Sequence, residues 1–359
     1  MSAAKAKGSQ PVKKINLALQ GGGSHGAFTW GVLDRLLEEP SLRIDSISGT
    51  SAGAMNAVAL ADGYTSCESQ DHAEASQNAR TRLEVFWRAV SNSAKNSIVR
   101  RTPLNQFIGN WSLEHSWGYH FSESISRLFS PYQINPLNIN PLKDILDSVI
   151  DFDTVNRCSG IKLFISATNV HTGRVKVFDS NKLSADIVMA SACLPQLFQA
   201  VEIDGVPYWD GGYMGNPSLF PFRDHTNTAD IVVVQINPIE RIGTPRTPVE
   251  IQNRLNEINF NSSLLKELRS INFVTRLIDE GKLDETQYRR EYIHIIENQK
   301  ELIPLGASSK LNAEWDFLQH LRDIGRDTAQ KWLDENFDHL GVASTVDLPA
   351  MFSGTGPSF

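Results

Sequence analysis

The chain has few cysteines, no long apolar stretch and no excess of positive charge, and each absence removes a class of protein. Its 359 residues include only Cys67, Cys158 and Cys193, without CxxC spacing, so a disulfide scaffold or a cysteine metal site is not expected. No apolar run approaches the ~18 residues of a membrane-spanning helix, and no secretory signal is expected at the N-terminus. The formal net charge of −7 gives no general attraction for nucleic acid. These features predict a reduced, cytoplasmic protein.

What remains is the composition of a globular protein, 41% hydrophobic and 21% charged, in which strand-like and helix-like segments alternate. In the first part these segments are 14–20 (strand), 27–39 (helix), 44–48 (strand) and 52–61 (helix). Strands that alternate with helices favour a parallel sheet with helices on its faces. The sequence therefore predicts an α/β fold.

The same kind of pattern returns later in the chain. Asn140 and Pro141 predict the start of a helix that runs to residue 149, since asparagine is a good N-cap and proline fits the first helical position. Two hairpins, two further strands and two helices are predicted in the segments 161–179, 185–192, 201–208, 230–239, 291–297 and 315–337. The region from 248 onward is mainly helical in this pattern.

A serine between two glycines stands where the second predicted strand meets the second helix. The segment is Gly49-Thr50-Ser51-Ala52-Gly53, and Gly-x-Ser-x-Gly at a strand-to-helix turn is typical of a nucleophile whose backbone is strained. The helix that follows would direct its first N–H groups, that of Ala52 among them, at a developing oxyanion. An ordinary tight turn is the alternative interpretation.

Three consecutive glycines follow the first predicted strand. Gly21, Gly22 and Gly23 make a loop whose N–H groups can approach an anion closely. Gly21, Gly23 and Gly26 also satisfy the Gly-x-Gly-x-x-Gly pattern of a dinucleotide site, but Asp45 begins a strand where that pattern needs an acidic residue at a strand end. Beside a nucleophilic serine, the loop is better explained as the second half of an oxyanion hole.

A serine nucleophile needs a base, and an aspartate is the better candidate here. Among the nine histidines, only His25 lies in a loop that the pattern places near Ser51. Asp210 directly follows a strand-like run, and Gly211 and Gly212 leave the space around it open. A simple turn at these two glycines is the alternative.

Four motifs occur in a fixed order along the chain. They are Gly21-Gly22-Gly23-Ser24-His25-Gly26, Gly49-Thr50-Ser51-Ala52-Gly53, Ser191-Ala192-Cys193-Leu194-Pro195 and Asp210-Gly211-Gly212. In this order they resemble the patatin-like phospholipase family, and the residues after them resemble the helical extension of some bacterial members. The resemblance implies a three-layer α/β/α sandwich with a mainly parallel sheet, with Ser51 as nucleophile, Asp210 as base and the glycine loop as oxyanion hole. His25 is a departure, because the family usually has arginine or lysine there.

Five parts of the chain are predicted. They are a disordered arm at 1–14, a catalytic domain at 15–240 with a helical, aromatic-rich insertion at about 64–150, a mostly helical extension at 241–350 packed on that domain, and a flexible tail at 351–359. The aromatic side chains from Phe107 to Phe129 would line an acyl pocket, meet a lipid surface or simply pack under the insertion. His115 and His120 have a poor spacing for a metal, so no metal site is expected.

The resemblance implies a serine lipid acyl hydrolase that forms an acyl-serine intermediate without a cofactor. Its substrate would be a lipid or another acyl ester, with contact to a membrane surface left open and no nucleic acid partner. Because an exposed aspartate with a pKa of ~3.9 is a weak base for serine, burial is expected to raise the pKa of Asp210. The alternatives are a small-ester hydrolase or transacylase with the same residues, and a non-catalytic module that binds phosphate or lipid.

Overall fold

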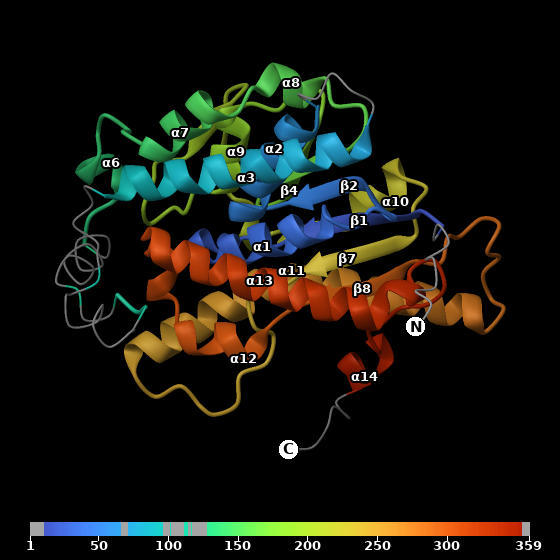
Figure 1. The fold of residues 1–359 in the computed structure, drawn as a ribbon. Helices are drawn as coiled ribbons and strands as arrows, with labels where there is room; N and C mark the ends of the chain where they lie inside the picture. Colours follow the sequence, from blue (N-terminus) through green and yellow to red (C-terminus); the bar gives the residue numbers. More distant parts are fainter. Residues whose placement is uncertain are drawn as a thin grey trace, which may run out of the picture.

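A mixed sheet runs through the centre of the computed structural model, which describes residues 11–65, 71–95, 101, 111–113, 116 and 128–353 (Figure 1). Its eight strands within the described residues are β1 (Lys13–Leu19), β2 (Leu42–Gly49), β3 (Lys162–Asn169), β4 (Val175–Asp179), β5 (Val201–Ile203), β6 (Val206–Asp210), β7 (Asp230–Val234) and β8 (Tyr292–Ile296). The strand order is β5-β6-β3-β2-β1-β7-β8, and β4 pairs with β3. The pairs β3-β2, β2-β1, β1-β7 and β7-β8 are parallel. The pairs β3-β4, β3-β6 and β5-β6 are antiparallel. The predicted α/β class with a mainly parallel sheet is confirmed.

Helices cover both faces of this sheet (Figure 1). They are α1 (Gly26–Leu36), α2 (Ala52–Thr65), α3 (His72–Ala94), α6 (Pro131–Ile134), α7 (Pro141–Val149), α8 (Phe152–Asn156), α9 (Ala185–Ser191), α10 (Phe220–His225), α11 (Pro248–Asp279), α12 (Gln299–Leu302), α13 (Trp315–Asn336) and α14 (Leu348–Ser353). Short 3-10 turns stand at η1 (Gly23–His25), η2 (Gly211–Tyr213), η3 (Ile303–Leu305), η4 (Ser308–Leu311) and η5 (Phe337–His339). The predicted cap of α7 is present, because the Asn140 side chain accepts the Leu142 N–H at 3.2 Å.

The two larger apolar cores lie on opposite faces of the sheet because side chains of a strand point alternately to its two faces. On β1, Leu17 and Leu19 belong to a core shared with α1, α2, α3 and α13, while Ala18 belongs to one shared with α10, α11 and α14. Helices on both sides of one sheet make the three-layer α/β/α arrangement.

The sheet continues into the part of the chain that was predicted as a mostly helical extension packed on the catalytic domain. β8 pairs with β7 in parallel, and α13 lies along α1 (Figure 1). The boundary at residue 240 therefore falls between two strands of one sheet. At the ends, β1 begins at Lys13, inside the predicted arm, and α14 extends to Ser353, inside the predicted tail.

α1 and α13 pack at very short distance where each contributes a glycine. A Cβ atom added to Gly31 would lie 1.9 Å from the Arg322 carbonyl oxygen, and one added to Gly325 would lie 2.1 Å from that of Phe28. The bare backbones of these two positions let the helices approach closely.

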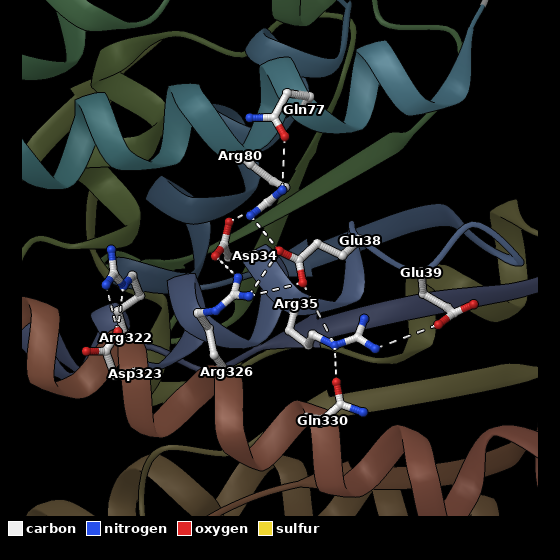
Figure 2. Close-up of polar contacts among 10 residues, drawn as sticks. All are labelled: Asp34, Arg35, Glu38, Glu39, Gln77, Arg80, Arg322, Asp323, Arg326 and Gln330. Carbon is white, nitrogen blue, oxygen red and sulfur yellow. Dashed lines mark hydrogen bonds and ion pairs between the residues drawn. The ribbon is translucent and has the colours of Figure 1, made fainter.

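Charged side chains join the same two helices to α3 (Figure 2). Asp34 of α1 accepts hydrogen bonds from Arg80 of α3, at 2.7 Å, and from Arg326 of α13. Glu38 pairs with the same two arginines, at 2.6 and 3.0 Å. Both arginines therefore bridge α1 to a neighbouring helix.

The predicted insertion is described only in part. α3, α6 and α7 are helical as expected for this segment, but most of the aromatic stretch from Phe107 to Phe129, as well as His115 and His120, lies outside the described residues. In the portion of the chain that is described, the helices lack the combined length and hydrophobicity that crossing a bilayer would require.

Candidate active site

The loops after three parallel strands open at one edge of the sheet. β2 and β7 flank β1, and Leu19 near the end of β1 is opposite Gly49 and Val234. β6 ends at Asp210, which pairs with Ala167 near the end of β3. In open α/β sheets, ligands bind at the carboxyl ends of the strands, so this edge is where a site is expected.

Ser51 lies directly between β2 and α2 with a left-handed backbone, φ 54°. Such a conformation is unfavourable for a residue with a side chain, and close packing around it maintains the turn. The Ser51 N–H donates to the Ser191 hydroxyl at 2.9 Å. A Cβ at Gly49 would lie 2.7 Å from the Gly53 carbonyl oxygen, and a Cβ at Gly53 would lie 2.2 Å from that of Leu19. The small residues of this motif are therefore required by the space available.

Asp210 is 2% exposed and lies beside the serine. One carboxylate oxygen accepts the Gly212 N–H at 2.6 Å, and the nearby Ser51 side chain favours the charged form of the carboxyl group. Burial raises the pKa of Asp210 to about 7, against the opposing effects of the Gly212 N–H and the Ser51 side chain. Its own N–H donates to the Cys193 carbonyl at 2.8 Å. The expected rise in pKa is present.

The two glycines after Asp210 allow close contact on both sides of the turn. A Cβ at Gly211 would lie 2.1 Å from the Ser166 carbonyl oxygen, and a Cβ at Gly212 would lie 2.1 Å from the Phe260 ring. Larger residues at either position would displace the carboxylate from the serine.

The glycine loop lines the same cavity, but its three residues differ in how their N–H groups are used. The Gly21 N–H donates to the Asn216 side chain at 2.7 Å and is therefore occupied. The N–H groups of Gly22 and Gly23 make no hydrogen bond to another residue within the described ranges. Ala52 is buried at the first turn of α2, where N–H groups have no partner inside the helix.

His25 is a neutral side chain in this site. Burial and the positive charge of Lys310 lower the pKa of His25 to about 3, and its Nε2 lies 2.7 Å from the Ser309 hydroxyl. A Cβ at the neighbouring Gly26 would lie 2.6 Å from the Ala52 side chain. The loop is thus held by a neutral hydrogen bond to a residue of η4.

These groups meet in a cavity of about 450 Å³. Its lining includes Gly21, Gly22, Gly23, His25, Ser51 and Asp210, together with Leu194, Tyr213, Phe260, Asn237, Arg241, Asn253, Lys310 and Leu311. Residues on both sides of position 240 line this cavity. No group of three or more potential metal-ligating side chains is present in the described part of the chain.

Sequence reasoning missed Asn216, Asn237 and Lys310. Asn216 follows Asp210 by six positions and had a weak local signal, since it precedes a proline in a loop. Asn237 and Lys310 carry no local motif, and Lys310 is more than 250 residues from Ser51 in the chain. Only the fold brings them to the cavity.

Comparison with known proteins gives one family and several distant structures. Residues 17–223 match the profile of the family described as patatin-like phospholipase. No protein with a curated description matches the chain. Among solved structures, VipD from Legionella pneumophila is similar at 16% identity and a TM-score of 0.34, over 88% of this chain and 67% of that one. ExoU in complex with SpcU from Pseudomonas aeruginosa is similar at 14% identity and a TM-score of 0.27, over 89% of this chain and 53% of that one.

Proposed function

Because the chain belongs to the patatin-like phospholipase family, whose members hydrolyse carboxylic esters, we propose that it is a lipid acyl hydrolase with Ser51 as nucleophile and Asp210 as general base. The observation that carries this assignment is the buried carboxylate of Asp210 in the same cavity as Ser51, a serine with a φ of 54°. In the proposed chemistry, the Ser51 hydroxyl and the Asp210 carboxylate share one proton.

The reaction begins when Asp210 takes the hydroxyl proton of Ser51 as its oxygen attacks the ester carbonyl. The C–O bond to the leaving alcohol then breaks, the protonated Asp210 returns the proton to that alcohol, and an acyl-serine remains. Water attacks this ester with Asp210 again as base, which releases the fatty acid and restores Ser51. A base with a pKa of about 7 suits proton transfer near neutral pH.

The oxyanion formed in each attack needs hydrogen-bond donors. We assign this role to the N–H groups of Gly22, Gly23 and Ala52, since that of Gly21 is occupied by Asn216. Each such donor is typically worth ~3 to 4 kcal/mol in the transition state. Gly21 instead keeps the loop close to Ser51, because a Cβ there would lie 2.8 Å from the Ser51 Cβ.

The exposed face of α11 supports contact with a lipid surface. Ile251, Leu255 and Ile258 are 45%, 48% and 49% exposed, and their spacing of four and three residues places them on one face of the helix. Asn253 and Asn256 of the same helix line the cavity. We propose that this apolar stripe rests on the membrane from which the substrate is taken.

The first prediction tests the two catalytic residues. Wild type, Ser51→Ala and Asp210→Asn are assayed with a short-chain nitrophenyl ester and with phospholipid vesicles, after each is shown to be folded by circular dichroism. Both variants are expected to lose at least ~10³-fold in kcat, as is typical when a catalytic group is removed. Serine-directed fluorophosphonate should label wild type and leave Ser51→Ala unlabelled.

Other outcomes separate the alternatives. Variants as active as wild type would show that Ser51 is not the nucleophile. Turnover of the short ester alone would favour a small-ester hydrolase, and acyl transfer to an added alcohol in preference to water would favour a transacylase. A wild type that neither labels nor turns over would favour a module that binds phosphate or lipid without catalysis.

A further inference from the structure

One cation in the cavity plays no part in the reaction described above. Lys310 belongs to η4 and lines the same cavity as Ser51 and Asp210. Its ammonium group donates to the Asn237 side-chain oxygen at 2.6 Å. An ammonium has three donors, and this is the only hydrogen bond of the Lys310 side chain to the described residues.

Lys310 is held against the glycine loop at two points. The Asn237 amide nitrogen donates to the Gly21 carbonyl at 2.8 Å, so one amide connects the loop to the ammonium. The Lys310 carbonyl oxygen would lie 2.5 Å from a Cβ at Gly23, which shows how closely η4 packs on the loop. The lysine is therefore fixed relative to Ser51 by the fold and is not a mobile surface group.

The positive charge of Lys310 has no carboxylate partner within the described chain. The charge of Glu257 raises the pKa of Lys310, but the Glu257 carboxylate forms ion pairs with Arg241 at 2.6 Å and with Arg254 at 3.1 Å. His25 is neutral. A partly buried cation without a paired counter-ion is unfavourable, so an anion that enters the cavity would be stabilised by contact with the Lys310 ammonium.

We propose that Lys310, positioned by Asn237, binds the phosphodiester of a glycerophospholipid whose acyl ester lies at Ser51. This subsite rests on the proposed function. A phosphodiester keeps its negative charge at all relevant pH values, and ammonium–phosphate hydrogen bonds are among the stronger ones in proteins. The carboxylate of the released fatty acid shares this chemistry, so the experiment must distinguish the two anions.

The test compares two lipids that have identical acyl chains and differ only in the headgroup. Phosphatidylglycerol and diacylglycerol are presented in nonionic detergent micelles to wild type and to Lys310→Met. We expect kcat/KM for phosphatidylglycerol to fall at least ~10-fold, the loss of about one charged hydrogen bond, and that for diacylglycerol to fall less than ~3-fold. Lys310→Arg, which keeps the charge, should retain most of the preference for the phospholipid.

Controls keep the outcomes distinct. Lys300→Met removes an exposed lysine of α12 that does not line the cavity and should match wild type. If Lys310→Met does not fold, Lys310→Gln and Lys310→Arg provide the same comparison. Equal losses on both lipids, or none on either, would overturn the subsite. Weaker inhibition by added oleate with an unchanged lipid preference would assign Lys310 to the fatty-acid carboxylate and overturn the phosphodiester assignment.

The experiment also distinguishes failure of the proposed function from failure of the subsite. A wild type that hydrolyses neither lipid would overturn both proposals, whereas hydrolysis of both lipids with no dependence on Lys310 would overturn the subsite alone.

The pH dependence of the lipid preference is a second readout. Burial lowers the pKa of Lys310 to about 8, with Arg241 acting in the same direction and Glu257 opposing it. The other titratable groups that line the cavity are His25, Asp210 and Tyr213. Because the ratio of kcat/KM values for the two lipids cancels the contribution of Asp210, this ratio should fall as pH rises through about 8. A ratio that is constant up to pH 9.5 would contradict the role of Lys310.

Discussion

Burial of the Asp210 carboxyl group makes the stability of the protein depend on pH. Its pKa is raised from 3.8 to about 7 by burial, so the folded protein binds a proton that the unfolded chain releases at lower pH. A raised carboxyl pKa favours the folded state below about pH 3.8, and this advantage is lost as pH rises to about 7. Above pH 7 the buried charge therefore destabilises the protein, by up to ~4 kcal/mol at 1.36 kcal/mol per pKa unit.

The second prediction follows from the destabilising effect of the charged Asp210 side chain above pH 7. Asp210→Asn removes the charge and should raise the free energy of unfolding by ~1 to 4 kcal/mol at pH 8, while the gain should be much smaller at pH 4.5. Urea unfolding at the two pH values measures the difference. Asp224→Asn, at an exposed position, is the control and should show neither effect. A gain for Asp210→Asn that is the same at both pH values would contradict the raised pKa.

At the scale of residues, the sequence could predict the groups that lie in short motifs. Ser51 and Asp210 stand among glycines whose missing side chains leave a pattern in the sequence, and the structure brings both residues to one cavity. Lys310 leaves no such pattern, because its role depends on Asn237 and on the glycine loop, more than 70 and 280 residues away. Lysine is also common on protein surfaces, so the residue type at this position gave no signal of a function.

At the scale of elements, the contact between α1 and α13 joins the glycine loop to the C-terminal part of the chain. α1 begins directly after η1, and α13 follows η4, the turn that carries Lys310. The helices touch through Gly31 and Gly325, where a Cβ would lie about 2 Å from a backbone oxygen of the other helix. Backbone atoms cannot rotate away as side chains do, so a side chain added at either glycine would force the two helices apart.

The third prediction concerns this contact. Gly325→Ala should lower the free energy of unfolding by ~1 to 3 kcal/mol, as is typical of overpacking, even though alanine favours helix formation by up to ~1 kcal/mol. Asp327→Ala, at an exposed position of the same helix, should change stability little. Thermal unfolding of both variants tests the prediction, and a Gly325→Ala protein as stable as wild type would show that the crossing can relax.

Element positions were predicted well where a single segment carries its own signal. The helix at 141–149 has both a cap and a proline at its start, and α7 has these bounds. The place of β8 beside β7 could not be predicted, because strand order depends on which helices cover the sheet, and 57 residues separate the two strands. The extension at 241–350 was predicted from the end of the family resemblance near Pro238 and from the helical pattern that follows, and neither feature carries information about strand pairing.

At the scale of the whole molecule, the cavity is enclosed by segments from both sides of residue 240. The glycine loop and Ser51 come from one side, and α11 and η4 come from the other. Removal of the C-terminal part would therefore open the cavity and also delete β8 from the sheet. In this arrangement one face of α11 lines the cavity and the other is exposed at the surface of the molecule.

The last prediction tests the outer face of α11. Replacement of Ile251, Leu255 and Ile258 by serine removes three exposed aliphatic side chains without touching residues that line the cavity. At ~25 cal/mol per Å² of apolar area buried in lipid, the variant should bind phospholipid vesicles at least ~10-fold more weakly in a sedimentation assay. Its hydrolysis of a water-soluble ester should stay within ~2-fold of wild type, because Ser51 and Asp210 are unchanged.

A single exposed apolar residue far from the cavity gives the matched control for that variant. Val342 is 66% exposed, and the adjacent Gly341 N–H donates to Asp230 at the first residue of β7, so it lies at the sheet edge opposite Ser51. Val342→Ser should bind vesicles as wild type does. Equal vesicle binding by the α11 variant and wild type would show that the stripe does not meet the membrane, and a parallel loss of soluble-ester hydrolysis would show that α11 acts through the cavity instead.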